Sequence, residues 1–213
     1  MSDKTARIII VLWYLVGIAG FLIRPLRPLF QHLTPLGMLV AAVLLLYFHE
    51  PKNRKSGLIF AAIVLFGFVV EVIGVNTQLL FGNYAYGPAL GYKILNTPLA
   101  IGFNWLVLIY CTTALLKNIR ENWYFPLIGA SMMVIFDWMM EPVASATGMW
   151  TWCCEGVTLK NYIDWFLVSV FLFLIIRILK VEISNRIAGI LFIMQVVFFL
   201  ILNLLIRTAI WAY

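Results

Sequence analysis

The chain has 213 residues, of which 64% are hydrophobic and 11% are charged, and its formal net charge is +6. Soluble globular domains carry about 25% charged residues, so this composition excludes a water-soluble domain. Lys and Arg lie near the ends of apolar runs, where they set topology and meet anionic lipid, so the positive charge does not indicate nucleic-acid binding. We expect one integral membrane domain over residues 1–213.

Seven apolar runs have lengths near that of a bilayer-spanning helix. The repeated alternating strands of a transmembrane barrel are not visible, so the predicted fold is all-α, a polytopic bundle of about seven transmembrane helices. With the N-terminus inside, the inner segments hold more Lys and Arg than the outer ones, although Arg24 and Arg27 oppose this orientation. The predicted spans are residues 8–23, 35–48, 58–75, 98–116, 125–140, 162–179 and 187–206.

Two carboxylates end the fifth run. Asp137 and Glu141 are four residues apart, so they lie on one helix face, roughly 6 Å apart. Pro142 follows, and because proline lacks an N–H we expect the helix to stop or kink there. Glu71 lies near the same end of the third run. Each acid costs about 2.5–3.5 kcal/mol in a bilayer, so such residues face a protein interior, a watery cavity or a partner.

Aromatic residues crowd the two loops that join the runs on this side, residues 76–97 and 145–161. An interfacial belt of Trp and Tyr is the simpler interpretation of any single member. The whole set beside three acids favours a polar pocket with aromatic walls, provided that the helix order brings the acids together. The residues expected to line it are Tyr84, Tyr86, Asn104, Trp105, Trp150, Trp152, Asn161 and Trp165.

Other ligands are not indicated by the residue pattern. Neither histidine lies near the acids and the three cysteines match no metal spacing, so we expect no metal ion. Phosphate-loop and dinucleotide fingerprints are also absent from the sequence. Asp164 could join the pocket or simply begin the sixth helix, where the helix dipole favours an acid.

The chemistry predicted for such a pocket is proton transfer. Burial disfavours the charged form of a carboxyl, and two neighbouring carboxyls do not easily ionise together. One acid could therefore donate a proton while its neighbour acts as a base. Aromatic faces stabilise a cation by about 0.5–2 kcal/mol each, which suits a carbocation route. A proton-coupled transporter would also carry intramembrane acids, so this alternative stays open.

The motifs resemble those of a membrane carotenoid-biosynthesis family that includes the carotenoid 1,2-hydratases of the bisanhydrobacterioruberin and γ-carotene type. The resemblance covers roughly residues 70–166, and the flanking helices are similar only in hydropathy. At Asp164 the family leads us to expect a small residue, so no role is transferred to it. The matching residues are Phe81-Gly82-Asn83-Tyr84-Ala85-Tyr86-Gly87, Leu90-Gly91, Pro98-Leu99, Ile101-Gly102, Asn104-Trp105, Tyr110-Cys111, Asp137, Glu141-Pro142, Gly148-Met149-Trp150, Trp152, Asn161-Tyr162 and Trp165.

The resemblance implies that water adds across the terminal C1–C2 double bond of an acyclic carotenoid end to give a tertiary alcohol. Asp137 or Glu141 would donate the proton, the other would activate water, and Glu71 would hold the water or tune the pair. A carotenoid cyclase, using the same protonation, is the alternative within this chemistry. The partners implied are a lipophilic carotenoid, membrane lipids and other membrane enzymes of the pathway. Hydration transfers no electrons, so the resemblance implies no cofactor. The expected location is the plasma membrane of a prokaryote, and the distribution of Lys and Arg predicts that the N-terminus is inside.

Overall fold

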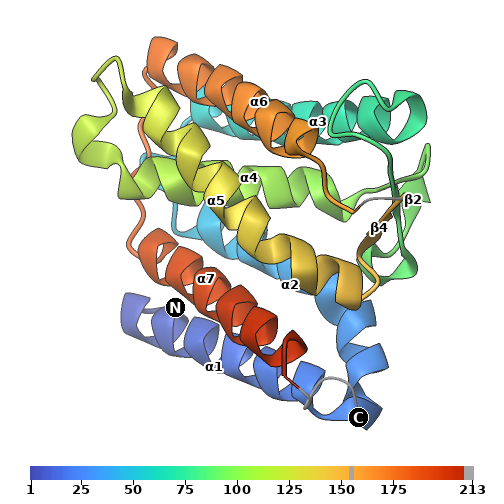
Figure 1. Ribbon diagram of the computed structural model, residues 1–213. Coiled ribbons are helices and arrows are strands. Elements are labelled where there is room, and N and C mark those ends of the chain that lie inside the picture. The colour runs from blue at the N-terminus through green and yellow to red at the C-terminus, as the bar shows by residue number, and fades with distance from the viewer. Residues whose placement is uncertain (154–155, 209–213) are drawn as a thin grey trace.

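A computed structural model describes residues 1–153 and 156–208 (Figure 1). Six of its helical segments are long and apolar enough to cross a membrane, and a seventh helix is shorter. The predicted all-α membrane bundle is thus confirmed. The helices are α1 Asp3–Leu22, α2 Arg27–Tyr47, α3 Arg54–Thr77, α4 Ala100–Leu115, α5 Phe125–Ala146, α6 Leu159–Ile178 and α7 Ala188–Ile206.

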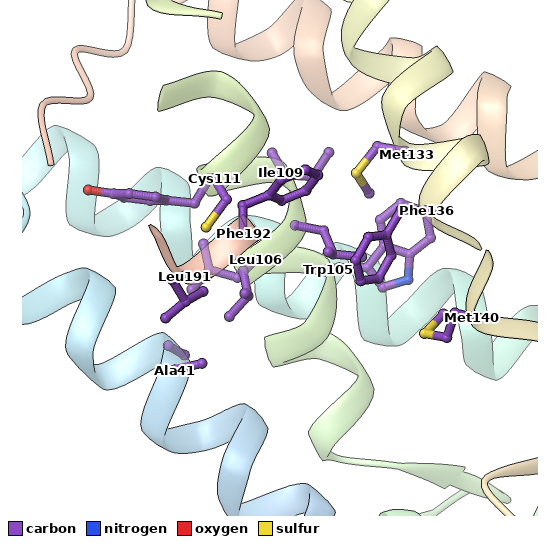
Figure 2. Packing of buried hydrophobic residues seen from close by; sticks show 14 of the residues in the cluster. Ala41, Trp105, Leu106, Ile109, Cys111, Met133, Phe136, Met140, Leu191 and Phe192 are labelled. Carbon is purple, nitrogen blue, oxygen red and sulfur yellow. The ribbon is translucent and has the colours of Figure 1, made fainter. Parts of the chain in front are cut away.

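Helix α4 forms the centre of the bundle. Thirteen of its sixteen residues are buried, and α2, α3, α5, α6 and α7 all pack against it (Figure 1). At about 1.5 Å per residue, its sixteen residues are shorter than the roughly 30 Å hydrocarbon core. Figure 2 shows Leu106 and Ile109 of α4 among side chains from neighbouring helices, including Met133 of α5 and Leu191 of α7.

Helix α3 approaches α4 closely because a glycine makes room for a large side chain. A Cβ on Gly67 of α3 would lie 2.6 Å from the Cβ and Cγ of Trp105, which is fully buried. Small residues allow helix backbones to come together in membrane bundles. Gly67 thereby lets Trp105 fit between α3 and the rest of the bundle.

Helix α5 passes through Pro142 and ends only at Ala146, so the helix does not stop at Pro142, and the predicted alternative, a kink there, stays a prediction. Proline removes its own N–H bond, but membrane helices tolerate the loss where neighbouring packing continues. Val143 and Ala144, directly after the proline, are completely buried, and Thr147 donates from Oγ1 to the Val143 carbonyl over 2.7 Å. Burial of this last turn keeps Glu141 in the same continuous helix as Asp137.

The loops at one end of the bundle contain short strands that the hydropathy pattern did not predict. Strands β1 (Tyr84–Tyr86) and β4 (Trp150–Trp152) pair antiparallel, with Tyr84 opposite Trp152 and Tyr86 opposite Trp150. Strands β2 (Lys93–Ile94) and β3 (Thr97–Pro98) form a second two-stranded sheet. The first sheet joins the loop after α3 to the loop after α5 and covers the acidic side chains described next.

Candidate functional site

Three acids from two helices converge at this end of the bundle. Glu71 on α3 and Asp137 and Glu141 on α5 are 3%, 1% and 5% exposed. A cavity of about 20 Å³, enough for a water molecule and far too small for a carotenoid end group, is lined by Glu71 and Asp137. Glu141 does not line it, but accepts hydrogen bonds from two residues that do, Trp150 and Trp152. The cavity is lined by Glu71, Phe81, Tyr84, Tyr86, Ile101, Asp137, Met140, Trp150, Trp152, Asn161 and Trp165.

The paired strands β1 and β4 form an aromatic wall beside the acids, which consists of Tyr84, Tyr86, Trp150 and Trp152. Successive side chains of a strand alternate between faces, so the outer residues of each three-residue strand share one face. Tyr84, Tyr86 and Trp150 are buried on the face that meets the acids, while the central residues Ala85 and Thr151 are exposed. The alternation in Tyr-Ala-Tyr and Trp-Thr-Trp is the sequence signal of this sheet, but it is too short to predict a strand by itself.

Glu71 accepts three hydrogen bonds from aromatic side chains. Its Oε2 accepts from the hydroxyls of Tyr84 and Tyr86 over 2.5 and 2.7 Å, and its Oε1 accepts from the Trp105 indole N–H over 3.0 Å. An ionised carboxylate only accepts hydrogen bonds, so three converging donors match its ionised form. Glu71 is therefore suited to fix the aromatic wall in place.

Burial and the neighbouring Glu71 carboxylate raise the pKa of both the Tyr84 and the Tyr86 phenol above its ordinary value. Both hydroxyls therefore keep their protons throughout the neutral range and remain donors to Glu71. The two rings contact each other edge to face, with centroids 5.5 Å apart.

Glu141 and Asp137 have different hydrogen-bond environments. Glu141 Oε2 accepts from the indole N–H groups of Trp152 and Trp150, over 2.7 and 3.1 Å. Asp137 Oδ2 accepts from the Asn161 side-chain amide over 2.6 Å. Among the described residues this is the sole side-chain donor to Asp137, so its other oxygen remains available to carry a proton. Donors favour the charged form of a carboxyl, and Glu141 has two of them while Asp137 has one.

Trp105 contacts the site through Glu71 and through a stacked pair of indole rings. Its ring stacks on Trp165 of α6, with centroids 4.2 Å apart and planes 16° apart. Phe81 packs against both indoles, at centroid distances of 6.4 and 6.2 Å. Of the predicted pocket residues, Trp105 thus reaches the site through Glu71, whereas Trp165 lines the cavity itself.

Asn104 lies elsewhere. Although it precedes Trp105, it lines a separate cavity between α1, α2 and α7. Asp164 neither lines the acid cavity nor begins α6, which starts at Leu159. Its Oδ2 accepts from the Phe81 backbone N–H over 2.7 Å and from Lys160 Nζ over 2.6 Å. Asp164 therefore anchors the turn that leads into β1. Within the two described ranges, no three His, Cys, Asp or Glu side chains gather in a way that could hold a metal ion.

Residues 32–212 match the family described as carotenoid biosynthesis protein. The chain belongs to this family. The match includes all three acids and both strands of the aromatic wall, and the bundle is that of a multi-pass membrane protein.

A more specific similarity is to the bisanhydrobacterioruberin hydratase of Haloarcula japonica, with 29% identity over 138 residues. The aligned region covers 57% of this chain and 45% of that protein, so the chain spans about half of the relative's length. No solved structure matches the chain.

Proposed function

We propose that this protein is a carotenoid hydratase, which adds water across the terminal C1–C2 double bond of an acyclic end group to give a tertiary alcohol. Family membership and the similarity to a hydratase support this proposal. The observation that carries it is the cavity in which carboxylates and aromatic rings surround a space of about 20 Å³, the size of a water molecule.

In the proposed reaction, Asp137 is the proton donor. It lines the cavity, is 1% exposed and has its single amide donor on Oδ2. The proton passes to C2, where the electron pair of the double bond forms the new C–H bond, and C1 becomes a tertiary cation. Trp150, Trp152 and Tyr84 line the cavity, and in the proposed reaction their rings stabilise the cation by about 0.5–2 kcal/mol each.

Glu141 acts as the base that activates water. The two indole donors on Oε2 hold the carboxylate in one orientation. Water attacks C1, and one of its protons moves to Glu141 as the C–O bond forms. Asp137 and Glu141 lie on adjacent turns of α5, so transfer of that proton back to Asp137 restores the starting state. Hydration transfers no electrons and therefore needs no redox cofactor.

The end group reaches the acids only when the aromatic wall moves, because the cavity holds water but not an isoprenoid end. The wall consists of two strands of only three residues each, so few backbone hydrogen bonds hold it closed. Opening of this strand pair toward the bilayer would admit the substrate, and its closure would keep bulk water away from the cation. Controlled access of one water is what separates hydration from cyclisation, in which an internal double bond captures the same cation.

Expression in a bacterial host that makes an acyclic carotene tests the proposal, with products separated by liquid chromatography and weighed by mass spectrometry. We expect a more polar carotenoid heavier by one water. Asp137→Asn and Glu141→Gln should each lower its yield at least 100-fold, since general acid–base groups contribute about 10²–10⁴ in rate.

The matched control is Glu182→Gln, the same chemical change at an exposed residue outside the helices, which should retain full activity. A cyclic isomer of unchanged mass would instead assign the cyclase reaction. Full hydration by Glu141→Gln would overturn the acid–base scheme, and transmembrane flux without any change in several acyclic carotenes would favour a transporter.

A further inference from the structure

A second cavity, larger than the first, lies between α1, α2 and α7. Its volume is about 240 Å³, and its walls are mainly aromatic and aliphatic, with Phe21, Phe30, Phe198 and Phe199 among them. None of the described residues that line it is charged. Its size and apolar lining resemble those of small-molecule sites, which combine apolar walls with a few polar groups.

This cavity is bordered by residues on the lipid-facing surface of the bundle. Val16 and Trp13 of α1 are 57% and 41% exposed, and Leu33 of α2 is 37% exposed. All three line the cavity and belong to helices with the length and composition of membrane spans. A ligand would therefore enter sideways from the bilayer, between α1 and α2, and must be soluble in lipid.

Two buried amides in the cavity each have an atom without a hydrogen-bond partner among the residues that the structure describes. Asn104 of α4 is 4% exposed and its Nδ2 has no such partner, while Gln195 of α7 is 8% exposed and its Oε1 has none. An unpaired buried polar group is unfavourable, so a ligand that satisfies these amides gains affinity. One is a donor and the other an acceptor, and a hydroxyl both accepts and donates.

The second cavity is separated from the acids by a thin wall. Asn104 lines it, while the next residue, Trp105, bonds to Glu71. Met149 lines it too, while the next residue, Trp150, lines the acid cavity. A molecule bound here would therefore contact residues that are adjacent in sequence to residues of the acid site.

We propose that the cavity between α1, α2 and α7 binds an isoprenoid or polyene chain carrying a hydroxyl group, which hydrogen-bonds to Asn104 and Gln195. The apolar aromatic walls match a flat polyene, and the uncharged character of the described lining residues disfavours phospholipid headgroups. The choice of an isoprenoid alcohol rests on the proposed function, whose product belongs to this class. The cavity would then hold the hydroxylated end of the carotenoid after it leaves the acids.

Retinol, a fluorescent polyene alcohol, is a suitable probe for the purified full-length chain in lipid nanodiscs. We expect saturable binding of retinol and about 3- to 10-fold weaker binding of retinyl methyl ether, which keeps the chain but has no hydroxyl proton to donate. In the double variant Asn104→Leu/Gln195→Met, the two ligands should bind with equal affinity, because both partners of the hydroxyl are gone.

A second variant tests the volume of the cavity. Gly37 lines it, and a Cβ at this position meets Trp13 Nε1 at 3.6 Å, an ordinary contact, so Gly37→Leu fills space without a backbone collision. We expect at least 10-fold weaker retinol binding. Gly57→Leu is the matched control, since nothing lies within 4 Å of a Cβ there and the residue is exposed on another helix.

The binding result is independent of turnover. Glu141→Gln should bind retinol normally even though its yield of hydrated product is at least 100-fold lower, so a failure of the hydratase scheme leaves this test intact. The inference is overturned if wild-type protein does not bind retinol saturably, if Gly37→Leu binds as tightly as Gly57→Leu, or if the double amide variant still prefers the alcohol. Should Gly37→Leu fail to fold, the double amide variant alone decides the outcome.

Discussion

Tyr84 and Trp152 lie directly opposite each other in the β1–β4 sheet, yet their polar groups bond to different acids. The Tyr84 hydroxyl donates to Glu71 over 2.5 Å, and the Trp152 indole donates to Glu141 over 2.7 Å. Their rings contact each other, with centroids 5.3 Å apart. This one cross-strand pair therefore connects α3 to α5 through the sheet and couples the position of Glu71 to that of Glu141.

The first prediction concerns the indole donors of Glu141. Trp152→Phe keeps an aromatic face but removes the shorter hydrogen bond to Oε2, so the carboxylate loses part of its fixed orientation. A hydrogen bond to a charged group contributes about 1.5–3 kcal/mol, so we expect hydration to slow by roughly 10- to 100-fold. Initial rates of product formation in membranes, normalised to the amount of folded protein, measure the effect.

Trp138→Phe is the control for this substitution. Trp138 is also on α5 but is 60% exposed, so the same chemical change there should leave the rate unaltered. Equal rates for Trp152→Phe and wild type would show that the indole N–H does not support the base.

The second prediction concerns Glu71 and the stability of the wall. Glu71→Gln places an amide N–H₂ opposite groups that themselves donate, and the Trp105 indole has no acceptor to offer. We expect a loss of about 1–3 kcal/mol in the free energy of unfolding, seen as a lower melting temperature in detergent.

A double-mutant cycle with Tyr84→Phe separates this effect from general damage. Removing the Tyr84 hydroxyl should lower the free energy of unfolding by less in the Glu71→Gln variant than in wild type, because the partner carboxylate is already lost. Strictly additive losses would mean that the hydrogen bond between Tyr84 and Glu71 adds nothing to stability.

The positions of the helices follow from the sequence because the bilayer requires about 20 consecutive apolar residues. The third predicted span, residues 58–75, lies inside α3, which extends over Arg54–Thr77. The predicted start is too late because hydropathy falls at Arg54 and Lys55, although the helix already begins at Arg54. Asn53 caps this start, and its Oδ1 accepts a hydrogen bond from the Ser56 backbone N–H over 2.8 Å.

The site was only partly predictable, for three physical reasons. Hydropathy does not specify which helices are neighbours, so the sequence placed Glu71 and Asp137 at one depth but not side by side. Adjacent residues of a helix point about 100° apart, so Asn104 and Trp105 face different neighbours. Because α4 is buried on nearly all sides, its sequence has no polar face that would have indicated which of the two points toward the acids. The strands were missed because three residues are too few for a clear alternating pattern.

The third prediction is the behaviour of the protein in alkali. Tyr84 and Tyr86 have a pKa above the ordinary value of 10.0 because they are buried beside Glu71, so the folded state keeps protons that the unfolded state releases. Their contribution to stability is therefore complete below about pH 10 and declines as the pH rises further. Tyrosinate absorbance should show at least two of the nine tyrosines titrating only on unfolding.

Tyr84→Phe/Tyr86→Phe removes these two groups and should make the fall in stability above about pH 10 shallower. Reversible titration of all nine tyrosines in the folded protein near the ordinary pKa of 10.0 would contradict the burial of both phenols.

The fourth prediction concerns the end of the strand pair. Gly87 follows β1, and its N–H donates to the Met149 carbonyl over 2.8 Å, while a Cβ on it would collide with the carbonyl oxygen of Gly148. Because the obstacle is backbone rather than a mobile side chain, Gly87→Ala must displace β4 and with it the indoles that bond to Glu141. We expect a loss of about 1–3 kcal/mol in stability, measured by thermal unfolding, together with slower hydration. Gly57→Ala, at an open position, should change neither, and normal activity in Gly87→Ala would show that the register of the strands does not position the base.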